Sequence, residues 1–172
     1  MNASFKGRFV LVVAWQMLLL VGLIAWKQFT LVTGQSVLLR TVPVDPRDLF
    51  RGDYVILGYE ISRIPRAQWK EPAYEKGVVV YVSLRKRGRF WEAESVSRNA
   101  PAAPDNAPFL RGTVTTAAPE ELQVRYGIES YFVPEGTGTD LERAAGKGLV
   151  VEARVDRFGR AAIRAVRVEP NR

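Results

Sequence analysis

The sequence contains no cysteine and no histidine among its 172 residues. Without cysteine the chain can form no disulfide and has no thiol nucleophile, and without histidine it has no Ser-His catalytic pair. Zinc sites built from cysteine and histidine are excluded for the same reason. The absence of cysteine does not identify the redox compartment, since cysteine-free domains occur on both sides of a membrane.

Basic residues exceed acidic residues, 25 against 18, which gives a formal net charge of +7. Lys6, Arg8 and Lys27 flank an apolar segment, so the rest of the chain has 22 basic and 18 acidic groups, a net charge of +4. This excess weakly favours contact with an anionic membrane face or polymer. The basic residues are scattered and form no recognition-helix or RNA-platform pattern, so we expect no nucleic-acid partner.

The apolar segment from Phe9 to Trp26 contains no charged residue. Its 18 residues would form a helix of about 27 Å, close to the roughly 30 Å of a bilayer core. Lys6 and Arg8 precede it without an acidic residue, so the positive-inside rule places the N-terminus in the cytoplasm. We therefore predict a cytoplasmic N-terminus over residues 1–8 and a transmembrane helix over residues 9–26.

A cleaved signal peptide is the competing interpretation of this segment. Cleavage requires small residues at positions −3 and −1, whereas Leu23-Ile24-Ala25 is followed by Trp26 and Lys27. The apolar run is also longer than the core of a typical signal peptide. We predict an uncleaved anchor in the inner (cytoplasmic) membrane, a connector over residues 27–35, and an extracytoplasmic, periplasmic domain over residues 36–172.

Beyond the connector the chain is predicted to form short strands separated by turns. The predicted strands are Val37–Val42, Tyr54–Ser62, Val78–Leu84, Phe90–Ser97, Phe109–Thr116, Leu122–Val133, Leu149–Asp156 and Arg160–Val168. Residues 99–108 are rich in proline and alanine and predict a loop. Thr139 and Glu142 fit a capping box for one short helix, which Gly146 would end. The pattern predicts a mainly β fold, a small antiparallel barrel or sandwich-like domain behind the transmembrane helix.

One motif stands out in residues 52–59, which read Gly-Asp-Tyr-Val-Ile-Leu-Gly-Tyr. They match the pattern G-D-Y-x-x-L-x-Y at Gly52, Asp53, Tyr54, Leu57 and Tyr59. The chain therefore resembles the GDYXXLXY family of bacterial membrane-anchored proteins. The resemblance implies a place in the cell envelope. It also implies a polytopic membrane protein as partner, because relatives are often encoded beside multi-spanning membrane proteins.

Strand alternation divides the motif between two faces. Leu57 and Tyr59 share a face with Val55 and Ile61, which predicts a core stripe, while Tyr54 points to the opposite face and could contact a partner. Gly52 would supply a positive φ angle or a close approach, and Asp53 could accept hydrogen bonds from nearby backbone amides. A motif that only fixes the register of a strand is the structural alternative.

A second motif covers residues 126–138 and is also typical of the family. Its Glu129 and Glu135 suggest a carboxylate pair, but six steps along a straight strand would separate them by roughly 20 Å. Glycosidase pairs lie roughly 5 to 9.5 Å apart, so only a sharp reversal over residues 134–138 would bring the two together. In the structural alternative, Glu129 pairs with an arginine across the sheet and Glu135 lies in a turn.

Three further features carry weaker signals. The stretch from Pro46 is similar to type I signal peptidases, but Pro43 occupies the position of their nucleophilic serine, which argues against protease activity. Asp45, Asp48 and Asp53 alternate with arginines, so ion pairing explains them better than a metal. The basic residues 85–89 predict a solvated hairpin tip or a contact with lipid headgroups or an anionic envelope polymer.

The sequence is most consistent with a single-pass, non-enzymatic binding or assembly subunit for a polytopic membrane protein. The candidate binding residues are Asp53, Tyr54, Glu129, Tyr131 and Glu135, and no catalytic residue, metal or cofactor is predicted. One alternative is a hydrolase of an envelope glycan or lipid that uses Glu129, Glu135 or Asp53 as acid and base. The other is a barrel that holds a small ligand.

Overall fold

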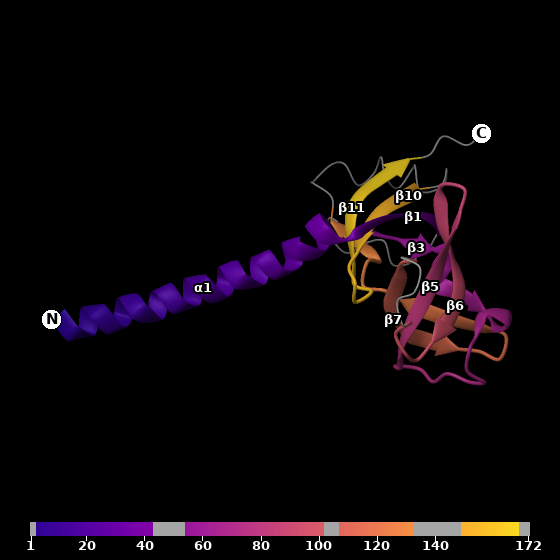
Figure 1. Ribbon diagram of the computed structural model, residues 1–172, viewed down its shortest axis with the longest axis horizontal. Helices are drawn as coiled ribbons and strands as arrows, with labels where there is room; N and C mark the ends of the chain where they lie inside the picture. Colours follow the sequence, from indigo (N-terminus) through magenta and orange to yellow (C-terminus); the bar gives the residue numbers. More distant parts are fainter. Residues whose placement is uncertain (1–2, 43–53, 102–106, 133–148, 169–172) are drawn as a thin grey trace.

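A computed structural model describes residues 3–42, 54–101, 107–132 and 149–168 of the chain. One long helix, α1 (Ala3–Thr33), projects from a domain built of strands (Figure 1). The mainly β fold with an N-terminal apolar helix is therefore confirmed. The short helix predicted from Thr139 lies outside the described residues.

The apolar part of α1 is the segment Arg8–Ala25, which is long and hydrophobic enough to cross a membrane. None of this segment is buried against the rest of the protein. A membrane anchor and a signal sequence share these properties. The helix continues into the predicted connector over residues 27–35 and ends at Thr33.

A single residue, Gly34, separates α1 from strand β1 (Gln35–Val42). The Arg154 guanidinium donates a hydrogen bond from Nη1 to the Gly34 carbonyl oxygen at 2.9 Å. A cation at this place also complements the negative end of the helix dipole. The helix is thus joined to the sheet by a short link that a side chain of the domain holds.

A four-stranded sheet follows this joint, with the strand order β11-β10-β1-β3. Its further members are β10 (Leu149–Val155), β11 (Ala161–Val168) and the short β3 (Gly58–Tyr59). All neighbours pair antiparallel. The predicted last hairpin is confirmed as β10 and β11.

Five other strands form a nearly closed antiparallel barrel with the order β4-β8-β7-β5-β6. They are β4 (Arg63–Pro65), β5 (Val79–Arg87), β6 (Phe90–Ser97), β7 (Phe109–Ala117) and β8 (Glu121–Arg125). The chain after β4 and the 3₁₀ turn η3 (Arg66–Gln68) meets β6, the strand at the other edge of this sheet. There Trp69 forms a parallel β-bridge with Val96, and the Lys70 N–H donates to the Val96 carbonyl at 3.0 Å.

Apolar side chains fill the interior of the barrel. They come from alternate positions of every strand, as the period of a half-buried strand requires. Fully buried examples are Ile64, Val80, Val82, Leu84, Val96, Leu110, Val114 and Leu122. This packing argues against the alternative in which the barrel interior holds a small ligand.

Two predicted strands are each broken into parts. The segment Tyr54–Ser62 divides into β2 (Tyr54–Ile56), β3 and the 3₁₀ turn η2 (Glu60–Ser62). The segment Leu122–Val133 divides into β8 and β9 (Ser130–Phe132). β2 pairs with β9 whereas β3 pairs with β1, so the chain changes partner at Leu57. The prediction of continuous strands was wrong because side-chain alternation does not reveal a change of partner.

Glu152 on β10 connects both neighbouring strands of the four-stranded sheet. It accepts a hydrogen bond from the Ser36 hydroxyl at 3.0 Å and forms ion pairs with Arg164 at 3.0 Å and Arg167 at 3.4 Å. The Ser36 hydrogen bond, helped by the two arginines and opposed by partial burial, lowers the pKa of Glu152.

This lowered pKa predicts a pH-dependent contribution to stability. The contribution is complete above the unfolded pKa of about 4.3 and is lost as pH falls through the lower folded pKa. We expect Glu152→Gln to destabilise the full-length protein in non-ionic detergent by up to about 1 kcal/mol at pH 7, and by less at pH 3. Thermal unfolding at both pH values measures this, with Glu94→Gln at an exposed ion pair as control. An equal deficit at both pH values would contradict the assignment.

Candidate functional site

The two sequence motifs lie against each other in the structure. In the β2–β9 ladder Tyr54 pairs with Phe132, Val55 with Tyr131, and Ile56 with Ser130. The contact continues past the ladder, because the Leu57 N–H donates to the Glu129 carbonyl at 2.7 Å. Motif segments that are far apart in sequence therefore form one local structure.

Two buried tyrosines connect the two motif segments by hydrogen bonds. The Tyr59 hydroxyl donates to the Ile128 carbonyl at 2.6 Å, and the Tyr126 hydroxyl donates to the Ile61 carbonyl at 2.6 Å. Only 1% of Tyr59 and 7% of Tyr126 is exposed. Each hydroxyl thus binds a carbonyl of the segment that carries the other tyrosine. We call Tyr59, Ile61, Tyr126, Ile128 and Glu129 the tyrosine junction.

A glycine makes room for one of these rings. Gly112 on β7 lies beneath Tyr126, and a Cβ atom at position 112 would come within 3.0 Å of the Tyr126 Cδ1 atom. It would approach a Val124 methyl group more closely still. Any larger residue at position 112 would force the Val124 side chain to move and would crowd the Tyr126 ring, so Gly112 belongs to the support of the junction.

Glu129 closes the tight turn between β8 and β9. Its carboxylate accepts the Tyr126 N–H at 2.5 Å on Oε1 and the Gly127 N–H at 2.8 Å on Oε2. Gly127 has a φ angle of +84°, in the left-handed region that favours glycine. The predicted pairing of Glu129 with an arginine across the sheet was wrong, because two consecutive backbone amides converge on the carboxylate instead.

The environment of the junction keeps both tyrosines protonated. Burial, and after it the negative charge of Glu129, raises the pKa of Tyr59 and of Tyr126 far above the usual range. A buried phenol next to a carboxylate resists ionisation for these two reasons. Both hydroxyls therefore act as hydrogen-bond donors and neither suits the role of a general base.

The structure separates the motif residues by role. Leu57 and Tyr59 are buried, at 3% and 1% exposure, which confirms their place in the core. Tyr131 is half-buried against the core, whereas its neighbour Phe132 is 77% exposed. Sequence reasoning overlooked Phe132, although alternation from an inward Tyr131 indicates an outward Phe132.

Several predicted site residues lie outside the described part of the chain. They are Gly52, Asp53 and Glu135, together with the side chain of Tyr54. The separation of Glu129 from Glu135 thus stays a prediction. The aspartates at positions 45 and 48 are also outside, and within the described ranges no group of three acidic side chains could hold a metal ion.

In the basic hairpin tip at residues 85–89, residues 85–87 are the end of β5, and Gly88 and Arg89 form the turn to β6. Gly88 has a φ angle of +62° there. Arg85 pairs with Glu94 at 3.5 Å and Arg87 pairs with Glu92 at 3.3 Å across the two strands. These exposed pairs fit the solvated-turn interpretation, and a contact of the tip with lipid or polymer stays a prediction.

The reciprocal hydroxyl contacts predict a coupled loss of stability. Tyr59→Phe and Tyr126→Phe each leave a buried carbonyl without its donor, so each should lower the free energy of unfolding by about 1–3 kcal/mol. The double variant should lose less than the sum, because both bonds close the same junction. Denaturant unfolding of the full-length protein in detergent measures these values.

Tyr81→Phe is the matched control for this double-mutant cycle of Tyr59 and Tyr126. The Tyr81 hydroxyl makes no hydrogen bond to any residue in the described ranges, so its removal should change stability by less than about 0.5 kcal/mol. Losses at Tyr59 and Tyr126 no larger than that of the control, or strictly additive losses, would contradict the reciprocal junction.

Comparison with known proteins gives one match. The family model described as GDYXXLXY protein matches residues 16–166, most of the chain. The matched range includes both motifs, the tyrosine junction and strands β1 to β10. No curated protein and no solved structure matches the chain.

Proposed function

This chain belongs to the GDYXXLXY family, and from that premise we propose that it is a single-pass envelope protein that assists a polytopic membrane protein. Helix α1 stays uncleaved as the anchor, with residues 1–8 in the cytoplasm and the strands outside. The protein acts as a non-enzymatic binding or assembly subunit. The observation that carries this proposal is the exposed Phe132 beside the buried tyrosine junction.

Two features of helix α1 support its proposed role as a membrane anchor. Lys6 and Arg8 precede the apolar segment, as the positive-inside rule expects for a cytoplasmic N-terminus. The helix runs without interruption from that segment to Thr33, and the next residue is bonded to Arg154 of the domain. An anchor joined in this way would hold the domain at a nearly constant height above the membrane.

The contact surface is the pair of strands β2 and β9, which we call the signature ribbon. Phe132 and Ser130 are exposed on β9, while Tyr131 between them packs toward the core. An exposed aromatic side chain on a fixed strand suits an interface, where aromatic residues are enriched. The register places Tyr54, another candidate contact residue, directly opposite Phe132.

The geometry of Glu129 favours binding over hydrolysis. Two backbone N–H groups already occupy its carboxylate, and the same turn positions Tyr126 and Ile128 in the junction. Proton transfer by Glu129 would weaken those charge-assisted hydrogen bonds during a reaction. A structural role for Glu129 leaves the exposed ribbon beside it as the functional surface.

In-cell photo-crosslinking from position 132 tests the partner. We expect a photoreactive residue in place of Phe132 to capture one multi-spanning membrane protein, and the same probe at Gln123 to capture none. Gln123 is exposed on β8 and serves as the matched position. Phe132→Ser should then reduce co-purification of the captured protein about tenfold, and thermal unfolding of the variant separates a lost contact from a lost fold. Equal capture at both positions, or no membrane-protein adduct, would refute the proposed surface.

The intact mass of the protein isolated from membranes tests the anchor. We expect a mass that includes residues 1–25, and resistance of the protein to alkaline extraction, because an inserted helix is held by its apolar surface. A mature N-terminus at or beyond Trp26, or release by alkali, would show instead that the segment acts as a signal sequence.

A further inference from the structure

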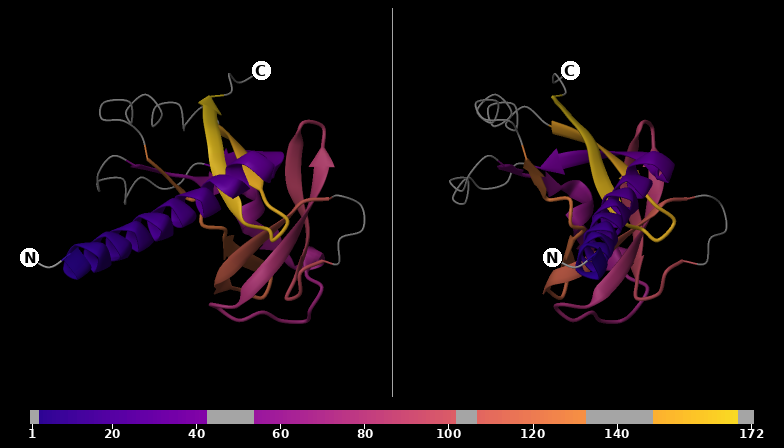
Figure 2. Two further views of the ribbon diagram at one scale, coloured as in Figure 1. Left: turned by 60° about the vertical axis from the view of Figure 1, so that its left-hand side comes forward. Right: turned by 90° about the vertical axis from the view of Figure 1, so that its left-hand side faces the viewer.

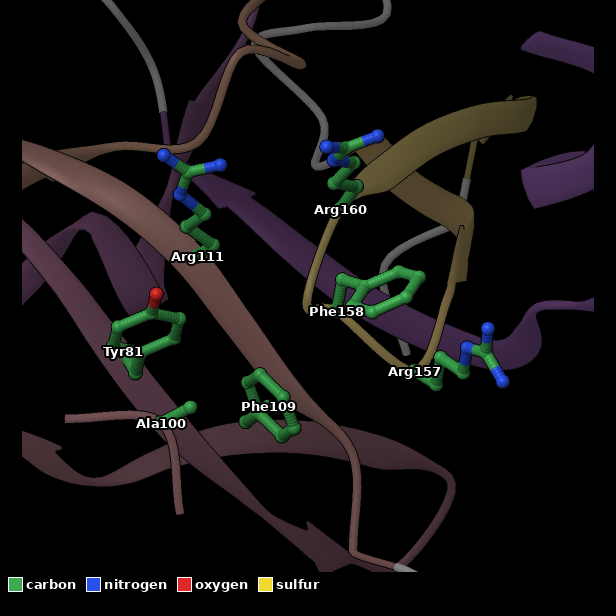
Figure 3. A pocket seen from close by; sticks show the side chains of 7 residues that line it. All are labelled: Tyr81, Ala100, Phe109, Arg111, Arg157, Phe158 and Arg160. Carbon is green, nitrogen blue, oxygen red and sulfur yellow. The ribbon is translucent and has the colours of Figure 1, made fainter. Parts of the chain in front are cut away.

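A surface cleft of about 280 Å³ lies between the barrel and the turn that joins β10 to β11 (Figure 3). Its size is near the lower end of small-ligand sites, which occupy about 300–1,000 Å³. The residues that line it are Tyr81, Ala100, Phe109, Arg111, Arg157, Phe158 and Arg160. None of them belongs to the signature ribbon or to the tyrosine junction.

The two walls of the cleft are held together by the backbone. The Arg111 N–H on β7 donates to the Gly159 carbonyl in the turn at 2.7 Å. Gly159 is buried with a φ angle of +78°, and a Cβ atom there would lie 2.8 Å from the Phe109 ring. Asp156 shapes the turn by accepting the Phe158 and Arg160 N–H groups at 2.9 Å. The cleft is therefore a preformed feature.

One end of the cleft is aromatic. Tyr81 and Phe109 form an edge-to-face pair with ring centroids 5.9 Å apart. Phe158 is 53% exposed across from them, and Figure 3 shows the rings of Phe109 and Phe158 on opposite sides of the same space. Two half-buried rings facing an exposed one can take up an apolar ring or chain of a ligand.

The other end is cationic. Arg111 and Arg160 extend to the same end of the cleft, toward which the Tyr81 hydroxyl also points (Figure 3). Arg157 lies over the Phe158 ring at 4.7 Å from its centroid and extends away from the end formed by Arg111 and Arg160 (Figure 3). Arg160 also lies over the Phe158 ring, at 5.9 Å from its centroid. In the part of the chain that the structure describes, no carboxylate forms an ion pair with Arg111. Guanidinium groups in this arrangement suit a phosphate or carboxylate.

The cleft lies toward the membrane. The turn between β10 and β11 is on the side of the domain from which α1 leaves, in both Figure 1 and Figure 2. Residues 26–33 of the helix extend about 12 Å beyond the apolar segment, and the headgroup layer is roughly 5–7 Å thick. A modest helix tilt, about 20° on average for membrane helices, would bring this side to the headgroups.

We propose that this cleft binds an anionic amphiphile. Arg111 and Arg160 hold its phosphate or carboxylate group, and Phe109 and Phe158 hold its apolar ring or chain. The ligand comes either from the anionic phospholipids of the membrane or from a soluble phosphate ester. The cleft is independent of the proposed partner role, but the lipid source rests on the uncleaved anchor.

Hydrogen–deuterium exchange of the full-length protein in nanodiscs tests the site. The reporting peptides cover residues 107–113 and 155–161. In phosphatidylcholine nanodiscs we expect phenyl phosphate to slow exchange there, and inorganic phosphate to require at least about tenfold higher concentration. Protection in phosphatidylglycerol nanodiscs alone assigns a lipid source, and protection by phenyl phosphate assigns a soluble one. No protection from either, or equal effects of the two phosphates, would overturn the proposal.

Arg111→Gln and Arg125→Gln form a matched pair of variants for this experiment. Both remove one exposed arginine from adjacent strands, but only Arg111 lines the cleft. We expect Arg111→Gln to weaken protection about tenfold or more and Arg125→Gln to leave it unchanged, with equal melting temperatures. Equally weakened protection in both variants would mean that the ligand is attracted by the net charge of the domain, and it would overturn the proposed site. Crosslinking from position 132 should be unaffected by Arg111→Gln, which separates this result from the partner test.

Discussion

Two buried hydroxyl groups hold the two halves of this domain together. Tyr59 belongs to the four-stranded sheet through β3, and Tyr126 directly follows β8 of the barrel. Each donates to a carbonyl of the segment that carries the other, at 2.6 Å. A buried carbonyl that loses its hydrogen-bond donor costs about 1–3 kcal/mol of free energy, so separation of the four-stranded sheet from the barrel at these two contacts is unfavourable. Glu129 fixes the turn on which both contacts depend.

This arrangement gives two of the motif residues, Leu57 and Tyr59, a structural role. Leu57 and Tyr59 are buried where the chain changes from one strand partner to the next. The two surfaces proposed for binding, the signature ribbon with Phe132 and the cationic cleft with Arg111, include no residue of the junction. With α1 as the proposed anchor, the short joint at Gly34 would present both at a constant distance from the membrane.

Sequence patterns predicted the elements whose side chains alternate and whose partner is the next strand, such as the hairpins β5–β6 and β10–β11. They also predicted the burial of Leu57 and Tyr59, because burial follows side-chain direction. They did not predict the break at Leu57, since residues on both sides of it keep the same alternation. The role of Glu129 could not be predicted because its partners are backbone amides, which leave no pattern in the sequence. The cleft could not be predicted because the residues that line it come from strands far apart in the sequence.

Native-state hydrogen exchange of the Leu57 and Gly127 amides tests the junction most directly. The Leu57 N–H is bonded to the Glu129 carbonyl and the Gly127 N–H to the Glu129 carboxylate. If the junction unites sheet and barrel, both amides should exchange only by global unfolding, with the same free energy as the Val114 amide within the barrel. Exchange of Leu57 and Gly127 through a local opening at least about 2 kcal/mol lower, with Val114 still protected, would contradict this account.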